Sequence, residues 1–265
     1  MNDFLSKVMD ERRQDARQAG RKTLSRELER QARERPRVSR RLSGTRRDPQ
    51  ATCIIAEVKK ASPSAGLLCQ DYNPAAIAAE YAAAGAVAIS VLTEPRYFLG
   101  SDDDLRAVRR AVSLPILRKD FIGAPYQIYE SAALGADLVL LIAAALDERT
   151  LRELYELATD LGLEVLVEAH TRAELERAAL LDQAIIGVNS RNLITLKTDL
   201  AVARRLAPFL PPGRLCVAES GIRTRRDIED LQALGYQGFL IGGALMKSPE
   251  VGAQLRSFLR PAGAE

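Results

Sequence analysis

The sequence predicts a (β/α)8 barrel, or TIM barrel, that follows an N-terminal helical extension. From residue 52 onward, eight short apolar runs alternate with longer segments of helical period. Eight parallel strands with helical crossovers, in about 210 residues, fit a barrel that is typically about 250 residues long. A doubly wound open sheet would need a glycine-rich dinucleotide loop after its first strand, where this chain has EVKKASPSAG. The barrel is therefore the predicted fold.

The eight predicted strands are runs of six or seven residues. They are TCIIAEV (52–58), VAISVL (87–92), PILRKD (115–120), DLVLLI (137–142), LEVLVEA (163–169), AIIGVN (184–189), RLCVAES (214–220) and GFLIGG (238–243). The intervening segments have the boundaries of helices. Asn73, Ser101 and Asp147 stand before three of them, where their side chains satisfy the free amides of a first turn. Glycines, which adopt a left-handed C-cap at least cost, follow four helices: Gly85, Gly135, Gly162 and Gly235.

Residues 1–50 form a separate basic extension, and residues 51–265 form the predicted barrel domain. The extension holds 15 Lys and Arg and eight acidic residues, which is a net charge of +7. Phe4, Leu5, Val8 and Met9 recur at helical spacing, so we expect this helix to dock on one face of the barrel. Aromatic residues for base stacking are absent here beyond Phe4, and we therefore expect no nucleic-acid partner.

Composition points to a cytoplasmic protein without a membrane partner. The apolar stretch 137–146 stops at Asp147, short of the roughly 20 residues that span a bilayer. The first residues lack the apolar core of a secretory signal. The three cysteines, Cys53, Cys69 and Cys216, are odd in number and show no CxxC spacing, which argues against a disulfide framework or a zinc site. We expect a monomer or a weak homo-oligomer.

Polar residues stand at the ends of six of the eight runs, the last run ends in two glycines, and in a barrel these ends share one rim. The residues of this rim are Glu57, Lys59 and Lys60; Ser90, Thr93 and Glu94; Arg118, Lys119 and Asp120; Glu168; Asn189, Ser190 and Arg191; Glu219, Ser220 and Gly221; and Gly242 and Gly243. Side chains alternate along a strand, so Glu57 and Lys59 point the same way, into the barrel mouth.

The lysines and glutamates of this rim predict a site for proton transfer. Neighbouring ammonium groups lower one another's pKa and carboxylates raise it, so such a set tunes acids and bases toward neutral pH. A ring of salt bridges that only stabilises the barrel top is the structural alternative, but burying several charges costs more desolvation energy than packing justifies.

Glycines after the last two runs predict a phosphate site. Gly221, Gly242 and Gly243 expose backbone amides, and a helix that begins after the eighth strand would direct its positive dipole to the same place. Barrels often bind phosphate at this position. His170 is the only histidine, so histidine metal clusters are excluded, and we expect His170 to be a hydrogen-bonded rim residue rather than a catalyst.

The chain resembles the indole-3-glycerol phosphate synthase family over residues 54–246. The matching stretches, in family order, are IIAEVKKASPSAG, AISVLTEPRYFLGS, PILRKDFIGAPYQIYESAALGAD, VLVEAH, GVNSRNL, VAESGI and GFLIGGALM. The resemblance implies a carbon–carbon lyase of tryptophan biosynthesis that needs no cofactor or metal. Its substrate, an anionic phosphosugar, is 1-(2-carboxyphenylamino)-1-deoxyribulose 5-phosphate, and its products are indole-3-glycerol phosphate, carbon dioxide and water.

The resemblance also implies roles for individual residues. Lys119 resembles the general acid of ring closure, Glu168 the acid/base residue of the dehydration, and Lys59 the group that engages the aryl carboxylate and later donates a proton. Residues that resemble the family's orienting and substrate-site groups are Glu57, Asn189, Glu219, Arg191 and Ser220. Those that resemble its pocket for the anthranilate ring are Ser90, Leu92, Phe98, Phe121 and Leu140, and its phosphate site corresponds to Gly221, Gly242 and Gly243.

Two positions depart from the family pattern. Many relatives have serine where this chain has Gly243, and a lysine where it has Ala65. The first change removes one hydroxyl contact to phosphate, which predicts weaker affinity rather than lost function. Two other functions stay open: another phosphosugar barrel, such as phosphoribosylanthranilate isomerase, which has less use for two lysines beside a bound carboxylate, and a catalytically silent binding barrel.

Overall fold

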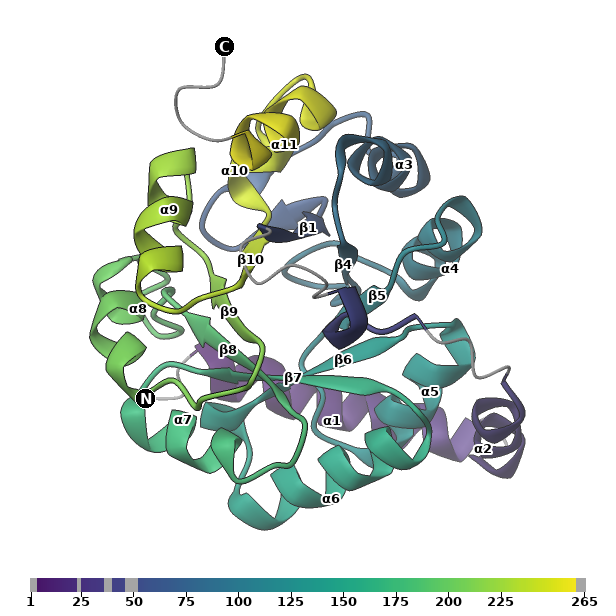
Figure 1. Cartoon of the computed structure of the whole chain (residues 1–265). Helices are drawn as coiled ribbons and strands as arrows, with labels where there is room; N and C mark the ends of the chain where they lie inside the picture. Colours follow the sequence, from purple (N-terminus) through teal and green to yellow (C-terminus); the bar gives the residue numbers. More distant parts are fainter. Residues whose placement is uncertain (1–3, 23–24, 36–39, 46–51, 261–265) are drawn as a thin grey trace.

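The structure, a computed structural model, describes residues 4–22, 25–35, 40–45 and 52–260 and confirms the predicted barrel. Eight parallel strands close into one ring in the order β1-β10-β9-β8-β7-β6-β5-β4, with β4 paired to β1. Helices surround this ring (Figure 1). The predicted domain boundary between residues 50 and 51 lies outside the described residues.

Each of the eight predicted runs contains one barrel strand. The strands are β1 (Cys53–Val58), β4 (Ala88–Leu92), β5 (Ile116–Lys119), β6 (Leu138–Ile142), β7 (Glu164–Ala169), β8 (Ile185–Asn189), β9 (Cys216–Glu219) and β10 (Gly238–Ile241). A two-stranded antiparallel hairpin, β2 (Ala61–Ser62) and β3 (Gly66–Leu67), lies in the loop after β1 and was not predicted. Two-residue strands carry too little periodicity to be recognised in a sequence.

Three helices begin after the predicted N-cap residues and two end at predicted glycines, whereas Gly162 and Gly235 stand one residue beyond the observed C-caps, Leu161 and Leu234. The helices are α3 (Pro74–Ala84), α4 (Asp102–Ala111), α5 (Pro125–Leu134), α6 (Glu148–Asp160), α7 (Arg172–Ala179), α8 (Ala201–Leu206), α9 (Arg225–Ala233), α10 (Gly243–Met246) and α11 (Val251–Leu259), with 3-10 turns η1 (Ser43–Thr45), η2 (Ala143–Ala145) and η3 (Ala207–Phe209). Asn73, Ser101 and Asp147 each accept a hydrogen bond from the first turn that follows. Gly85 and Gly135 end their helices with φ of 104° and 90°, which is the left-handed region that glycine enters without strain.

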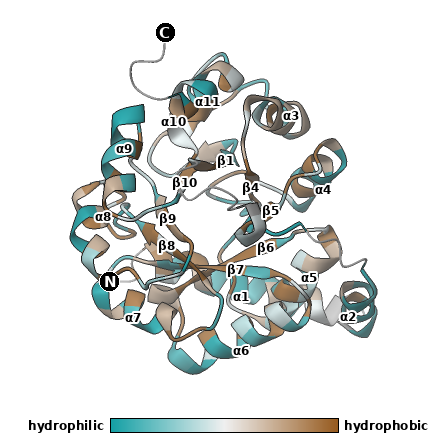
Figure 2. Ribbon diagram, in the orientation of Figure 1, coloured by the Kyte–Doolittle hydropathy of each residue, from teal (hydrophilic) through white to brown (hydrophobic). Residues whose placement is uncertain are grey.

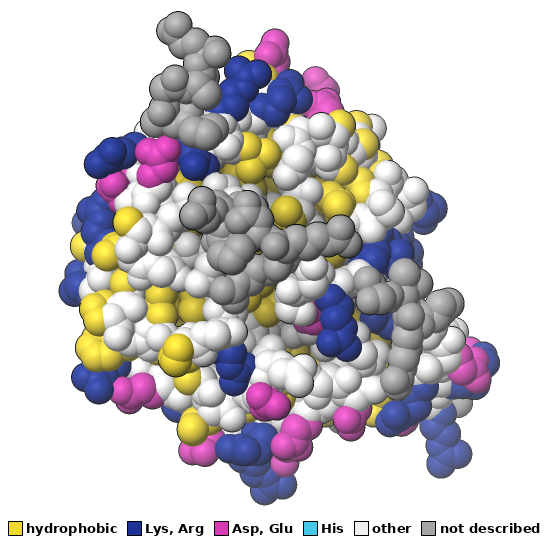
Figure 3. Space-filling model, in the orientation of Figure 1, with side chains coloured by type: hydrophobic (Ala, Val, Ile, Leu, Met, Phe, Trp, Pro, Cys, Tyr) yellow, Lys and Arg dark blue, Asp and Glu magenta, His cyan; other side chains and the backbone are white. Residues whose placement is uncertain are grey.

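The strands form the apolar centre of the molecule. Their residues are almost all buried, because the barrel interior is filled by side chains and helices cover the outside. Figure 2 shows the same division, with hydrophobic strands at the centre and hydrophilic outer faces on the helices. Acidic and basic side chains are interspersed around the edge of the face shown in Figure 3. Within the described ranges, no helix combines the length and apolarity that a membrane crossing requires.

The N-terminal extension docks on the barrel, as its hydrophobic spacing predicted. Its helices α1 (Phe4–Lys22) and α2 (Ser25–Glu34) lie beside α5 (Figure 1). Leu5, Val8 and Met9 are buried against the core. Farther along, the backbone amide of Leu42 donates to Glu164 at the start of β7. The extension therefore runs from the C-terminal ends of the strands, where α1 lies, to their N-terminal ends.

One buried ion pair fastens α1 to the barrel. Arg12 donates from Nε and Nη2 to the two carboxylate oxygens of Asp120 at 2.9 and 2.7 Å, and the Asp120 side chain is fully buried. Asp120 also accepts from Thr93 Oγ1 at 2.7 Å and from the amide of Phe121 at 2.8 Å. Burial raises the pKa of Asp120, but Arg118 and Arg12 outweigh it and hold that pKa below its usual value.

Arg12→Met is expected to lower the free energy of unfolding by about 3 kcal/mol, because it leaves a buried carboxylate short of one charged partner. Urea unfolding followed by circular dichroism measures the change. Arg30→Met is the matched control: Arg30 is exposed and pairs with Glu27 and Glu34 within one helix, so its loss should leave the free energy of unfolding nearly unchanged. Equal effects of the two substitutions would show that the Arg12 pair does not hold α1.

Candidate active site

A cavity of about 500 Å³ opens at the C-terminal ends of the barrel strands. Fourteen of the sixteen predicted site residues line it: Glu57, Lys59, Leu92, Phe98, Lys119, Phe121, Leu140, Glu168, Asn189, Arg191, Ser220, Gly221, Gly242 and Gly243. The remaining two, Ser90 and Glu219, lie behind its wall. An ion-pair network is present at the barrel top, but it surrounds an open cavity rather than filling it.

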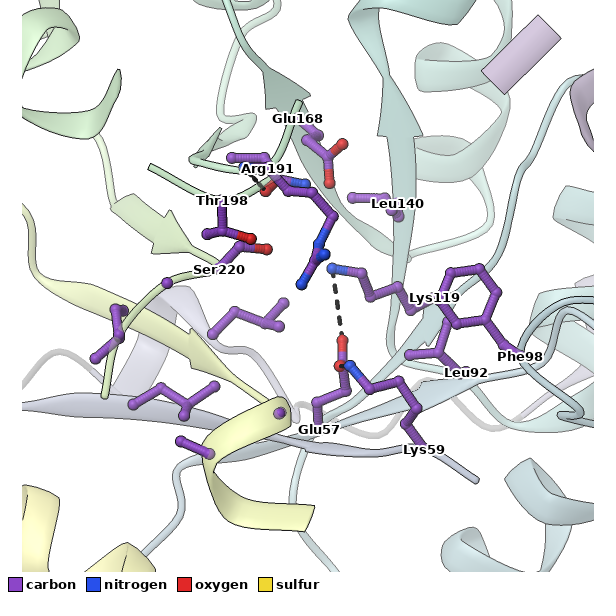
Figure 4. A pocket seen from close by; sticks show the side chains of 18 of the residues that line it. Glu57, Lys59, Leu92, Phe98, Lys119, Leu140, Glu168, Arg191, Thr198 and Ser220 are labelled. Atoms are coloured by element: carbon purple, nitrogen blue, oxygen red, sulfur yellow. Dashed lines mark hydrogen bonds and ion pairs between the residues drawn. The ribbon is translucent and has the colours of Figure 1, made fainter. Parts of the chain in front are cut away.

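Two lysine amines meet one buried carboxylate in this cavity. Glu57, near the end of β1, is only 4% exposed and forms an ion pair with the Lys59 amine. The Lys119 amine, from the last residue of β5, lies 3.6 Å from the other Glu57 oxygen (Figure 4). Burial raises the pKa of Glu57, but Lys59 and Lys119 outweigh it and keep that pKa below its usual value. Glu57 is therefore a carboxylate that holds both amines in place.

Glu219 provides a second carboxylate for Lys119. Its Oε2 accepts from the Lys119 amine at 3.0 Å, and its Oε1 is buried without a hydrogen-bond partner among the described residues. Burial raises the pKa of Glu219 to about 7, against the lowering effect of Lys119. Burial lowers the pKa of Lys119, but Glu219, Glu57 and Glu168 raise it overall. The Glu219 carboxyl group can therefore hold or release a proton near neutral pH, whereas Lys119 stays charged there.

Glycine is required behind Glu219 and Glu57. A Cβ on Gly187 would lie 2.2 Å from Glu219 Oε1, and one on Gly242 would lie 2.1 Å from Glu57 Oε1. The absence of a side chain at Gly242 therefore lets the Glu57 carboxylate lie against its backbone. This is a second reason for glycine at position 242, in addition to the predicted contact with phosphate.

Glu168 reaches the cavity from β7 and is backed by the single histidine. Its side chain is buried, and its Oε1 lies 3.4 Å from His170 Nε2. His170 does not line the cavity. It occupies the space between Glu168 and Glu174 of α7.

The loops after β8 and β9 close one side of the cavity. Asn189 Oδ1 accepts from the Arg191 amide at 2.9 Å, and the Arg191 guanidinium donates to the Leu196 carbonyl at 2.8 Å and to Ser64 Oγ at 3.1 Å. These contacts join the β8 loop to the hairpin loop after β1. Ser220 has a φ of 64°, an uncommon conformation for a residue other than glycine, and such strain clusters at functional sites.

Aromatic and aliphatic side chains form the apolar part of the cavity. The rings of Phe98 and Phe121 lie 6.1 Å apart, and Phe4 of α1 packs against Phe121 from behind at 6.4 Å. Ser90 was predicted here and does not line the cavity, because it lies two residues before Leu92 on the same face of β4 and therefore one layer deeper in the barrel.

The glycine end of the cavity carries two cations that the prediction missed. Arg223 and Lys247 line it together with Gly221, Gly242 and Gly243. The helix expected after β10 is only the four-residue α10, so its dipole adds little, and positive charge comes from these side chains instead. The sequence did contain a signal for these two cations: Arg223 stands two residues after Gly221, and Lys247 four residues after Gly243. Lys60 does not line the cavity and so does not replace the lysine missing at Ala65.

Asp120, which was predicted at the rim, also lines the cavity. Other lining residues were missed: Ile142, Leu193, Thr198, Ile222, Leu240, Ile241 and Ala244. Most are apolar residues of strands or loops that resemble ordinary core in a sequence. In the part of the chain that is described, no group of three or more His, Cys, Asp or Glu side chains is arranged to hold a metal ion.

Comparison with known proteins agrees with this geometry. The chain is 47% identical over 264 residues to indole-3-glycerol phosphate synthase of Carboxydothermus hydrogenoformans, covering 97% of this chain and 99% of the relative. It is 50% identical to the same enzyme of Rhodospirillum rubrum over 213 residues, covering 80% and 81% of the two chains. In fold alone it is similar to N-acetylmannosamine-6-phosphate 2-epimerase of Clostridium perfringens, with a TM-score of 0.55, 14% identity, and 72% of this chain and 86% of that one covered. The sequence profile of indole-3-glycerol phosphate synthase matches residues 5–258, and the chain belongs to that family.

Proposed function

We propose that this chain is an indole-3-glycerol phosphate synthase, a carboxy-lyase whose cavity closes, decarboxylates and dehydrates 1-(2-carboxyphenylamino)-1-deoxyribulose 5-phosphate. Family membership and the relatives' activity support the reaction. The observation that carries the proposal is the meeting of the Lys59 and Lys119 amines on Glu57 inside one cavity that also holds Glu168 and three glycines. This set supplies two cationic proton donors, a carboxylate and a cradle for phosphate.

Ring closure is assigned to Lys119. The ring carbon that bears the carboxylate attacks the ketone carbon, and a carbon–carbon bond forms. The Lys119 ammonium donates a proton to the ketone oxygen, which becomes a hydroxyl. Glu219 and Glu57 support this step, because both carboxylates favour the charged amine before it acts. The aryl carboxylate faces Lys59, and the rings of Phe98 and Phe121 border the anthranilate ring.

Decarboxylation and dehydration complete the reaction. The bond to the carboxyl carbon breaks, its electron pair returns to the ring, and carbon dioxide leaves. Lys59 then donates a proton to the hydroxyl, which departs as water, while Glu168 accepts a proton from the new five-membered ring. Two protons enter and one leaves, which balances the loss of the negatively charged carboxylate. The product is indole-3-glycerol phosphate.

A product assay distinguishes this function from that of a phosphoribosylanthranilate isomerase. Purified protein is mixed with the carboxyphenylamino substrate, and indole absorbance and released carbon dioxide are followed. We expect one equivalent of each per substrate consumed. Phosphoribosylanthranilate is the comparison substrate, and its isomerisation without turnover of the first compound would favour the isomerase. Failure to turn over either compound would favour a silent binding barrel.

The phosphate is assigned to the end of the cavity formed by Gly221, Gly242 and Gly243, with Arg223 and Lys247 beside it. Gly243→Ser should lower KM severalfold, because a Cβ there meets nothing within 4 Å and the added hydroxyl can donate to phosphate. Gly242→Ser is the matched control. It should lower activity sharply, since its Cβ would clash with Glu57. Steady-state kinetics measure both effects. The same change in KM and kcat for the two variants would contradict the assignment of the phosphate to this end of the cavity.

The cytoplasm is the compartment we propose. Cys53, Cys69 and Cys216 are all free thiols, as is usual where thiols are kept reduced. We also propose a monomer or a weak homo-oligomer.

A further inference from the structure

His170 lies directly behind the carboxylate that the proposed function uses for dehydration. It is the only histidine in the chain, and its side chain is 14% exposed. Its Nε2 lies 3.4 Å from Glu168 Oε1, and its Nδ1 lies 3.5 Å from Glu174 Oε2. The three side chains form a row from the cavity wall to α7, in the order Glu168, His170, Glu174.

The start of α7 fixes the outer end of this row. Thr171 caps the helix by accepting from the Glu174 amide, and Glu174 Oε2 accepts from the His170 amide at 2.7 Å. Glu174 is therefore held by the capping turn, and it holds His170 in turn. Glu168 lies near the end of the pairing between β7 and β8, opposite Gly187. The backbones at both ends of the row are therefore fixed by regular structure.

The charges around His170 favour an imidazolium. Glu168 on β7, Glu174 on α7 and Glu219 on β9 are the acidic groups that act on it. The cations of adjacent elements are engaged elsewhere: Arg177 donates to the carbonyls of Ala143 and Leu146, and Arg191 donates to Leu196 and Ser64. Burial lowers the pKa of His170, but the glutamates raise it above its usual value overall.

We infer that His170 is a positioning residue for the dehydration: its imidazole, between Glu168 and Glu174, keeps the Glu168 carboxylate directed into the cavity. The inference rests on the proposed role of Glu168. Because Glu168 Oε1 faces Nε2 of the ring and Glu174 Oε2 faces Nδ1, the imidazole limits the positions that the Glu168 side chain can occupy.

Substitution of His170 should therefore slow the dehydration without weakening substrate binding. In His170→Asn, kcat is expected to fall about tenfold with little change in KM, because the Glu168 carboxylate is no longer held toward the substrate. Arg172→Gln is the matched control. It removes one positive charge two residues away, from a side chain that is 60% exposed and paired with Glu176, and should leave kcat and KM unchanged.

A second measurement depends neither on activity nor on the His170→Asn variant. Because the chain has one histidine, NMR of the untagged protein reports the titration of His170 without assignment of other imidazoles. Glu168→Gln should lower the pKa of His170, since it removes a negative charge that raises this pKa. An unchanged titration, or a kcat of His170→Asn equal to that of the unmodified chain, would overturn the inference. A fully active Glu168→Gln variant would instead refute the role of Glu168, which separates the two failures.

Discussion

Lys119→Ala is expected to lower kcat about 10³-fold or more, because it removes the group that protonates the ketone oxygen as the ring closes. The amine lies 3.0 Å from Glu219 and 3.6 Å from Glu57, and among the described residues Lys119 is the lysine that pairs with both carboxylates. Single-turnover mixing with the substrate, followed by indole absorbance, measures the loss. Carbon dioxide release should fall by the same factor, since decarboxylation follows ring closure.

A folding control makes the Lys119 result interpretable. The substitution leaves Glu57 and Glu219 as neighbouring buried carboxylates, so circular dichroism and urea unfolding must show a native barrel before activity is compared. Lys60→Ala is the matched lysine variant, because Lys60 follows the end of β1 at the same rim of the barrel and does not line the cavity. Its activity should be near that of the unmodified chain. Near-normal turnover by Lys119→Ala would show that another group is the general acid of ring closure.

Glu168→Gln is expected to block the reaction at a later step. Ring closure and loss of carbon dioxide need Lys119 and should continue, whereas removal of the ring proton needs the Glu168 carboxylate. Rapid-quench measurements should show about one equivalent of carbon dioxide per enzyme molecule in the first turnover, with indole formation slowed about 10²- to 10⁴-fold. Loss of carbon dioxide release together with indole would place Glu168 in ring closure instead.

The arrangement of strands and helices could be predicted because its signals are local. A capping residue such as Asn73 and a terminating glycine such as Gly85 act within one helical turn. The residues that determine where a helix begins and ends are therefore neighbours in the sequence. Barrel topology then brings Glu57, Lys119 and Glu168 to one rim although they are distant in the chain. Once eight strands were recognised, the residues at the strand ends could therefore be predicted to line one cavity.

The features that were missed depend on depth and on contacts between distant segments. Ser90 has the residue type of a site residue but lies one layer too deep, and strand periodicity does not report depth. The pairing of Arg12 with Asp120 joins positions separated by 108 residues. Many arginines of the extension were equal candidates, so nothing in their spacing marks this one. Arg223 and Lys247 are exposed cations that only the cavity distinguishes from ordinary surface charge.

The most direct test of the central claim is a crystal structure with a substrate analogue whose ketone is reduced to an alcohol, so that ring closure cannot occur. The account predicts one bound molecule with its phosphate on the amides of Gly221, Gly242 and Gly243. Its aryl carboxylate should lie within hydrogen-bond distance of the Lys59 amine, and its alcohol oxygen within that distance of the Lys119 amine. A molecule bound elsewhere, or one that contacts only one of the two lysines, would contradict the account.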